Sequence, residues 1–324
     1  MKETVYLLNE GILYRNKSTL FFQNFEGKKA VPINSISEVI CCTRVTIKSG
    51  CLSYLMKKQI PIHFYSMYGW YQGTLYPREF LISGNVIVKQ AEHYLDNEKR
   101  IKIAKEIVRG IKHNILKNLE YYKNRGRDIN TEVIEALDIE KCSNIPELMS
   151  IEGRIWSNYY NSFDKILRGF KLIKREKRPP SNEVNSLISF GNALLYTKCL
   201  GEIYRTYLNP AISFLHEPSE RRFSLALDIA EIFKPLFVSR TIFSLVNKKE
   251  IDKDCFEKVE GGVLLNNKGK KIFIEAFDKK LSTTIFYPGL GRKVNYTEII
   301  RIECQKLIDH ILGNKEYKSF KMWW

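Results

Sequence analysis

The chain has 324 residues, with 52 Lys and Arg against 36 Asp and Glu, which gives a formal net charge of +16. A hydrophobic content of 44% supports a folded core and excludes a mostly disordered chain, and the length suits one large domain or two ordinary ones. No apolar run approaches the ~18 residues of a membrane-spanning helix, and the first residues lack the pattern of a secretory signal. The charge makes nucleic acid the leading partner, with a merely soluble basic protein as the alternative.

The seven cysteines are scattered, and none of them forms a CxxC pair. An odd number without metal-ligand spacing fits neither a disulfide scaffold nor a zinc ribbon. We therefore expect reduced, mostly buried thiols in a cytoplasmic protein.

Residues 1–85 are predicted to form a β-rich domain. Short apolar segments alternate with turn residues, and the strand candidates are Thr4–Leu8, Ile12–Tyr14, Thr19–Phe22 and Ile60–Tyr65. Asn24–Lys29 reads as a turn, and one helix is expected from about Thr46 to Lys58. Short strands at such spacing favour a small sheet or sandwich.

Residues 86–324 are predicted to form a larger, mostly helical domain. Apolar residues between Ile101 and Ile115 recur at spacings of three and four, as on one face of a helix. Gly261–Gly269 interrupts the helical pattern, and a small hairpin is expected between Val263–Leu265 and Ile272–Ile274. The predicted fold class is α+β, with a small β-rich domain followed by a larger all-α domain.

The most basic segment is residues 168–178, RGFKLIKREKR, in which Glu176 is the single acid. Phe170, Leu172 and Ile173 are expected to anchor it to the folded core. Such a run suits a surface that faces phosphates, and a solvated helix face is the alternative. The candidate DNA-binding residues are Arg168, Lys171, Lys174, Arg175, Lys177 and Arg178, together with Arg221 and Arg222.

Glu152 stands out because it lies on an apolar helix face. A helix is expected after Pro146, and its apolar stripe runs from Leu148 to Phe163 with Glu152 inside it. A carboxylate that faces inward is costly unless it is paired or bound to a metal. A salt bridge to one of the many Arg and Lys residues is the alternative.

Two more acids lie in a nearly all-apolar helix predicted for Phe223–Phe237. Asp228 and Glu231 fall roughly 60° apart on its one narrow polar strip. They should repel each other unless a cation neutralises them. A metal ion would do so, and pairing with Arg221, Arg222 or Lys234 is the alternative.

His216 ends an apolar run just before this helix and is followed by Glu217 and Pro218. It is a candidate nitrogen ligand beside the acids, and a hydrogen-bonded core histidine is the alternative. One imidazole with carboxylates suits Mn²⁺ and tolerates Mg²⁺.

A helix expected to begin near Ser181 or Asn182 carries an unusual polar row. Its members are Asn185, Ser189, Asn192 and Tyr196. The row would line a groove or support metal ligands from behind, and an ordinary solvent face is the alternative.

Taken together, these segments resemble the family of CRISPR-associated adaptation integrases, which are metal-dependent endonucleases. The similarity is carried by Glu152–Arg154, Lys177–Asn182, Asn185–Tyr196, Pro210–His216 and Leu225–Glu231. The tail Tyr317–Trp324 resembles the ending of the type I-B subgroup.

The resemblance implies a β domain that mediates homodimerisation and a helical catalytic domain. It implies a Mg²⁺ or Mn²⁺ site formed by Glu152, His216 and Glu231, with Asp228 as a nearby second acid. It also implies a small ferredoxin-like partner protein, which would assemble with the dimers into a heterohexamer.

The implied reaction is the attack of a spacer 3′-hydroxyl on a phosphodiester of the repeat in double-stranded DNA. With water as the nucleophile, the same site would cleave DNA. The sequence contains no GxxxxGK[ST] loop for nucleotide hydrolysis. A catalytically inactive DNA-binding scaffold of the same fold is the alternative function.

Overall fold

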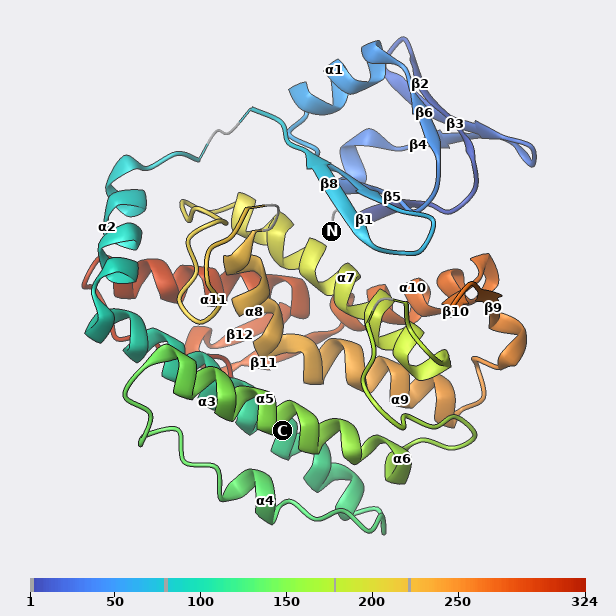
Figure 1. Ribbon diagram of the computed structural model, residues 1–324. Coiled ribbons are helices and arrows are strands. Elements are labelled where there is room, and N and C mark those ends of the chain that lie inside the picture. The colour runs from blue at the N-terminus through green and yellow to red at the C-terminus, as the bar shows by residue number, and fades with distance from the viewer. Residues whose placement is uncertain (1–2, 79–80, 178, 221–222) are drawn as a thin grey trace. The chain divides into compact units, whose positions relative to one another are not determined.

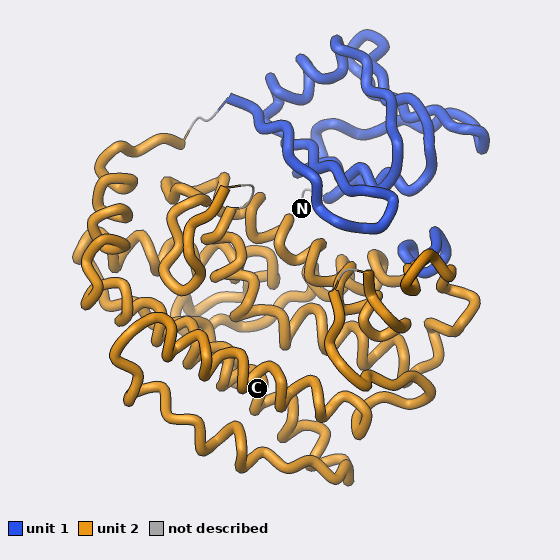
Figure 2. Tube along the Cα trace, viewed as in Figure 1, with its two compact units in different colours: residues 1–80, 266–271 blue, residues 81–265, 272–324 orange. Residues whose placement is uncertain are grey.

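The computed structural model describes residues 3–78, 81–177, 179–220 and 223–324. It divides into two compact units, residues 1–80 with 266–271 and residues 81–265 with 272–324 (Figure 2). The sequence predicted a boundary at residue 85 and gave no sign that residues 266–271 would group with the first unit. The predicted DNA-binding residues Arg178, Arg221 and Arg222 lie outside the described residues.

The first unit contains two four-stranded sheets (Figure 1). One has the order β1-β5-β7-β8, in which β1, β5 and β7 are parallel and β8 returns antiparallel. The other has the order β4-β3-β2-β6, in which only the β2–β6 pair is parallel. The strands are β1 (Glu3–Leu7), β2 (Gly11–Asn16), β3 (Thr19–Asn24), β4 (Gly27–Val31), β5 (Ile36–Cys41), β6 (Val45–Ile47), β7 (Ile62–Tyr65) and β8 (Tyr71–Leu75).

One apolar core joins the two sheets and helix α1 (Ser49–Lys57). Leu13 and Leu20 of the second sheet, Val39 and Ile62 of the first, and Leu55 of α1 are all buried in it. The predicted helix is therefore present and shorter than expected. The turn predicted for Asn24–Lys29 is wrong in its second half, because the chain reverses before Gly27 and pairs again as β4.

The second unit is mainly helical. Helix α7 is buried around most of its circumference and packs against α8, while α3 packs against both α8 and α5 (Figure 1). The helices are α2 (Gly84–Leu95), α3 (Asn97–Lys123), α4 (Glu132–Glu135), α5 (Ile145–Asn161), α6 (Phe163–Ile166), α7 (Glu183–Tyr204), α8 (Ser224–Lys234), α9 (Arg240–Asn247), α10 (Asn267–Ser282) and α11 (Tyr296–Ile311).

Helices α8 and α9 form one continuous rod through a π-helical segment, Pro235–Ser239. Proline lacks an N–H and disturbs the regular helical hydrogen bonds at this point. Side chains of α3 bond to two carbonyl groups of this irregular stretch, since Asn114 Nδ2 donates to Ile232 O at 2.9 Å and Asn118 Nδ2 donates to Pro235 O at 2.6 Å. The rod is thereby fixed to α3 at its irregular point.

Two small hairpins complete the unit, β9 (Phe256–Val259) with β10 (Gly262–Leu265) and β11 (Thr284–Tyr287) with β12 (Arg292–Asn295). A hairpin is thus present at Val263–Leu265, but these residues pair with the preceding strand β9 and not with a later one. The strand predicted for Ile272–Ile274 is wrong, because these residues belong to α10. The α+β fold class is confirmed.

The cysteines follow the expectation: all seven are free and buried. Among the described helices, none is long and apolar enough to cross a membrane.

The space around Gly191 of α7 shows that the helical unit is closely packed at this position. A Cβ atom there would lie 2.7 Å from Val238 Cγ1 and 2.8 Å from Phe273 Cζ. Overpacking costs about 1–3 kcal/mol, which exceeds the helix propensity of ~1 kcal/mol gained by removing glycine. We expect Gly191→Ala to lower the free energy of unfolding in denaturant titrations.

Gly153 provides the matched control, because it is an exposed glycine of α5 whose added Cβ would meet nothing within 4 Å. Gly153→Ala should gain up to ~1 kcal/mol from helix propensity. Stabilisation by both substitutions would contradict the close packing at Gly191.

Candidate active site

Two buried carboxylates from different helices share one site. Glu152 of α5 is 8% exposed and Glu231 of α8 is 6% exposed. Burial, followed by the negative charge of Glu231, raises the pKa of Glu152 from 4.5 to about 7. The positive charges of Lys234 and His216 oppose this rise. The two carboxylates therefore repel each other, and the positive charges of Lys234 and His216 reduce this repulsion.

Lys234 is the cation that neutralises Glu231. Its ammonium group donates to Glu231 Oε1 from one helical turn further along, and it lies 5.5 Å from the centre of the Trp156 ring. The other oxygen, Glu231 Oε2, is buried without a hydrogen-bond partner among the described residues. This is the pairing with Lys234 that the sequence left open, and it uses only one of the two carboxylate oxygens.

His216 is held by Asp228, which is fully buried at the start of α8. Asp228 Oδ1 accepts from His216 Nδ1 at 2.8 Å and from His216 N at 3.0 Å. Asp228 Oδ2 accepts from the backbone N–H groups of Phe214 and Leu215. Both oxygens are therefore engaged, and His216 keeps Nε2 for another partner. Asp228 is placed as the support of His216, while Glu231 faces Glu152.

The environment of His216 follows from this arrangement. Burial alone would lower its pKa, but the hydrogen bond and charge of Asp228 and the charges of Glu231 and Glu152 raise it above the usual 6.5. These interactions place Glu152, Glu231 and His216 in one electrostatic neighbourhood, although 64 residues separate Glu152 from His216 in the sequence.

The segment that carries His216 is fixed from three helices. Gln90 of α2, which is fully buried, donates from Nε2 to the carbonyl groups of Asn209 and Ile212. Arg100 of α3 donates from Nε to Phe214 O at 2.9 Å. Ser224 Oγ of α8 donates to Ala211 O at 2.8 Å. The position of the imidazole therefore depends on contacts far from it in the sequence.

The polar row of α7 is not a solvent face. Asn185 is fully buried and Tyr196 is 8% exposed, while Ser189 and Asn192 are half-buried. Asn185 Nδ2 donates to Lys174 O at 2.8 Å, and its Oδ1 accepts from Glu176 N at 3.0 Å. Asn185 thus fastens the basic run to α7.

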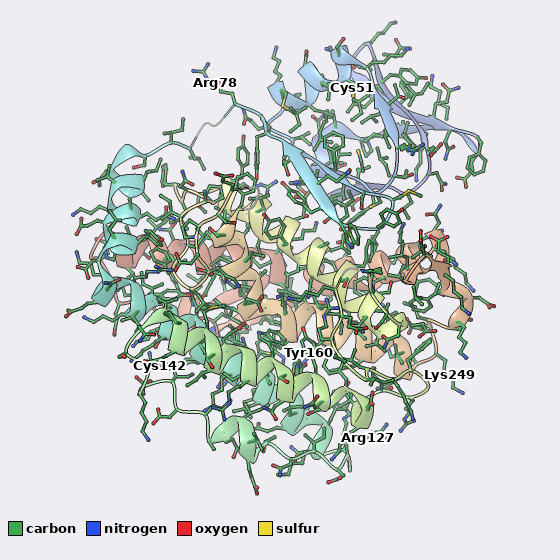
Figure 3. All side chains as sticks on the ribbon, viewed as in Figure 1. Cys51, Arg78, Arg127, Cys142, Tyr160 and Lys249 are labelled. Carbon is green, nitrogen blue, oxygen red and sulfur yellow. The ribbon has the colours of Figure 1, made fainter. Side chains whose placement is uncertain are left out.

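Arg175 points into the protein. It donates to Asn185 Oδ1 and Ser189 Oγ at 3.0 Å each, and its charge also acts on Tyr160, which is labelled on α5 in Figure 3. Burial lowers the pKa of Arg175. Its predicted exposure to phosphates is therefore wrong, and it braces the segment from within.

Tyr196 fixes the beginning of α8. Its hydroxyl oxygen accepts a hydrogen bond from Phe223 N at 3.0 Å. Phe223 is the N-cap residue of α8 and has no capping side chain of its own. Tyr196 therefore helps to position the helix that carries Asp228 and Glu231.

The rest of the basic run is an irregular surface segment. The alternative of a solvated helix face is therefore wrong, because residues 168–177, the described part of the run, form no helix. Arg168, Lys171, Lys174 and Lys177 are exposed. The segment is anchored as expected through buried Leu172, whose N–H donates to Asp164 Oδ1 at 2.6 Å, but Ile173 is 86% exposed.

Lys177 connects the run to the acids. The negative charges of Glu231 and Glu152 act on its ammonium group, although burial and the charges of Lys234 and Arg175 lower its pKa overall. Lys177 therefore lies within electrostatic range of both carboxylates.

The three predicted ligands are not pre-assembled. Among the described residues, no group of three His, Cys, Asp or Glu side chains lies close enough to hold a metal ion. The donor set nevertheless fits a hard divalent cation, because it offers carboxylate oxygens, one of them without a partner, and a free imidazole nitrogen. Without a bound metal, Lys234 forms an ion pair with Glu231.

Sequence reasoning missed the supports of the site. Lys234 was named only as the alternative to a metal, although its i,i+3 spacing from Glu231 on one helix favours the pair. Gln90 and Arg100 carry no local signal, because their role depends on which loop the fold brings to them.

Comparison with known proteins identifies the family. The family model described as CRISPR associated protein Cas1 matches residues 5–279. The chain belongs to the Cas1 family. A CRISPR-associated protein Cas1 from Methanobrevibacter ruminantium is 49% identical over 100% of this chain and 99% of its own length. A CRISPR-associated endonuclease Cas1 from Methanothermobacter thermautotrophicus is 46% identical over 100% of this chain and 96% of its own length.

Solved structures agree with this assignment. A Cas1 protein from Thermotoga maritima is 39% identical, covers 98% of this chain and 100% of its own, and has a TM-score of 0.88. A casposase bound to integration product shares the fold at 20% identity and a TM-score of 0.88, with coverage of 100% and 94%. A chain of a Cas6-RT-Cas1–Cas2 complex shares the fold at 17% identity and a TM-score of 0.86. The match covers 100% of this chain and 36% of that one. The family predicted from the sequence is confirmed; the subgroup stays a prediction.

The raised pKa of Glu152 predicts how stability depends on pH without metal. Below about pH 4.5 the group is protonated in both the folded and the unfolded state, and its burial costs nothing extra; the cost grows up to about pH 7 and then stays constant. With chelator present at about pH 8, Glu152→Gln should unfold at a higher free energy than wild type, by up to about 3 kcal/mol.

The gap between the two proteins in urea titrations should close as the pH falls toward about 4.5. A gap that does not change with pH would show that Glu152 titrates normally. Adding Mn²⁺ at the higher pH should favour wild type over the variant.

Proposed function

We propose that this chain is a divalent-metal-dependent DNA endonuclease and integrase that inserts spacer DNA into a CRISPR repeat array. The observation that carries the proposal is that Glu152, Glu231 and His216 act on one another's charge in one buried acidic region, which Lys234 neutralises only in part. The names of the relatives as endonucleases and the casposase bound to integration product support the reaction class.

Mg²⁺ or Mn²⁺ would be held by Glu152, by Glu231 through its unpartnered Oε2, and by His216 through Nε2. When bound, the cation supplies Lewis-acid stabilisation of the negative charge that develops on the reacting phosphate. Asp228 holds the ring of His216 in one orientation, which is the usual role of a carboxylate behind a ligating histidine.

The chemistry is phosphoryl transfer without a change of oxidation state. In integration, a DNA 3′-hydroxyl oxygen forms a bond to the phosphorus of the repeat, its proton is released, and the bond to the displaced 3′ oxygen breaks. With water in place of the hydroxyl, the same exchange is hydrolysis. The ammonium groups of Lys177 and Lys234 lie beside the acids and would offset the charge of an approaching phosphate.

DNA would lie along the exposed cations of the basic run, Arg168, Lys171, Lys174 and Lys177. Asn185 and Arg175 fix this run to α7, so its cations are presented from a supported segment. Double-stranded DNA is the substrate that the proposed reaction requires.

The partners are also part of the proposal. The β-rich unit would form a homodimer, because both of its sheets end in strands that pair on one side only among the described residues. A small ferredoxin-like partner would complete a heterohexamer, and the neighbour solved as a Cas6-RT-Cas1–Cas2 complex supports a Cas2 partner.

Alanine substitution tests the function. Glu152→Ala, His216→Ala and Glu231→Ala should each lower Mn²⁺-dependent cleavage and integration by at least about 100-fold, because each removes a ligand of the charge-stabilising cation. Cleavage of labelled duplex DNA and integration into a repeat-bearing plasmid are the measurements.

Glu275→Ala is the control, because Glu275 is an exposed acid of α10 away from the site. Undiminished cleavage by the three variants would contradict the assignment of the site. Wild-type protein that binds DNA but neither cleaves nor integrates it with Mg²⁺ or Mn²⁺ would favour the inactive scaffold.

Lys234 gives a second test, because its ammonium group occupies Glu231 when no metal is bound. Metal binding must break this ion pair, so Lys234→Met should bind Mn²⁺ roughly five- to tenfold more tightly. The metal-free variant should also unfold at a lower temperature, since its two carboxylates lose their neutralising partner. Calorimetric titration with Mn²⁺ and thermal unfolding measure the two effects.

Lys141→Met is the matched control, because Lys141 is 85% exposed and the same charge is lost. Mn²⁺ binding to Lys234→Met that is no tighter than to the control would show that Lys234 does not compete with the metal.

A further inference from the structure

A group of cations outside the carboxylate site has little acidic compensation. Its members lie just after α3, at the two ends of α9 and near the end of α10. Figure 3 labels Arg127, which follows α3, and Lys249, which follows α9. We call the residues Arg125, Arg127, Arg240, Lys248 and Lys280 the cationic track.

Lys280 is the most unusual member. It is half-buried, and among the described residues it has no hydrogen bond and no ion pair through its side chain. Burial first, and then the like charges of Arg240 and Lys248, lower its pKa from 10.5 to about 8. A buried cation beside other cations costs stability, and such a cost is typical of a residue kept for binding.

Two backbone hydrogen bonds and one ring contact place the Lys280 backbone near the rod of α8 and α9. Thr283 N donates to Lys280 O at 3.0 Å, and Tyr296 N donates to Thr283 O at 3.2 Å. The Tyr296 ring then packs on Phe237, one turn before Arg240, with centres 5.4 Å apart. The end of α10 is thereby fixed near the start of α9.

Arg240 is oriented with its outer nitrogens free. Its Nε donates to Asn118 Oδ1 at 2.5 Å, and the described residues provide no partner for the two terminal nitrogens. The guanidinium carbon lies 6.0 Å from the centre of the Tyr121 ring, and that of Arg125 lies 4.3 Å from the same centre. Tyr121 is 43% exposed. Two arginines thus flank one accessible aromatic ring.

The track continues into the basic run. Arg168 N donates to Asn247 Oδ1 at 2.9 Å, so exposed Arg168 lies next to Lys248, which follows Asn247 in the chain. Two solvent-facing acids flank this part of the track, and each pairs with a lysine: Glu250 lies 3.8 Å from Lys248, and Asp128 lies 3.0 Å from Lys165. Both are highly solvated, and neither touches Arg240 or Lys280.

We propose that the cationic track is a second phosphate-binding surface, which holds the backbone of DNA beyond the reacting phosphodiester. The inference rests on the proposed function for its choice of DNA over other polyanions. Several cations in a row, one of them an arginine with two free guanidinium nitrogens, suit the regularly spaced phosphates of a nucleic-acid backbone. Glu231 and Arg240 lie on the same rod, roughly 13 Å apart along its axis, so DNA held at both places would be fixed in register.

Lys280→Met provides the test, since it removes the charge and keeps the apolar stem. We expect two opposite effects from one substitution. The melting temperature should rise by roughly 2–5 °C, because an uncompensated buried charge is removed. The affinity for a fluorescein-labelled duplex of random sequence should fall roughly tenfold at low salt, and the log–log salt slope should flatten by about one.

Lys279→Met is the matched control, because the neighbouring Lys279 is exposed on α10 and loses the same charge. It should change neither the melting temperature nor the salt slope appreciably. Lys248→Ala, at a 68% exposed position, should flatten the slope like Lys280→Met without risk to the fold. The Glu152→Ala protein should keep the wild-type slope, so failure of the nuclease assignment is seen separately in cleavage.

DNA binding by Lys280→Met and Lys248→Ala that equals the control would overturn the proposal, and an acidic protein partner would then be the better candidate. A lower melting temperature for Lys280→Met would overturn the claim that Lys280 is held at a cost.

Discussion

The repulsion between two buried carboxylates, Glu152 and Glu231, is the constraint on which the catalytic unit depends. Each lies on a helix whose buried face is mostly apolar, and burial next to a like charge raises the pKa of Glu152 to about 7. Lys234 relieves this repulsion through one oxygen of Glu231 and leaves the other buried without a partner. Such an arrangement is costly for stability alone, and it is what a site prepared for a divalent cation requires.

The surrounding structure keeps these groups in place. Asp228 uses both oxygens to hold His216 and the two preceding residues, and Arg100 and Gln90 fix the same segment from other helices. The rod of α8 and α9 is fastened to α3 across the disturbance at Pro235. These contacts hold the helices and the His216 loop in place, so the change that cation binding requires is confined to side chains such as that of Lys234.

Much of this could be predicted from sequence, because the signals were local. Helical spacing identified Glu152 as an acid on an apolar helix face, and it placed Asp228 and Glu231 on one polar strip. Local patterns could not divide the work between those two acids, since this depends on the loop of His216 folding back onto Asp228. Nor could they show that Arg175 turns inward, because its partners Asn185 and Ser189 meet it only in the folded chain. The strand predicted for Ile272–Ile274 was wrong because a short apolar run is compatible with a strand or a helix equally.

The position of the bound cation tests the account most directly. Crystals of the full-length protein soaked in Mn²⁺ and measured at the manganese absorption edge would reveal the ion by its anomalous signal. The account predicts a peak between Glu152, Glu231 and His216, with the Lys234 ammonium group moved away from Glu231 and Asp228 still bonded to His216. A manganese peak only at exposed acids, with the ion pair between Lys234 and Glu231 intact, would contradict it.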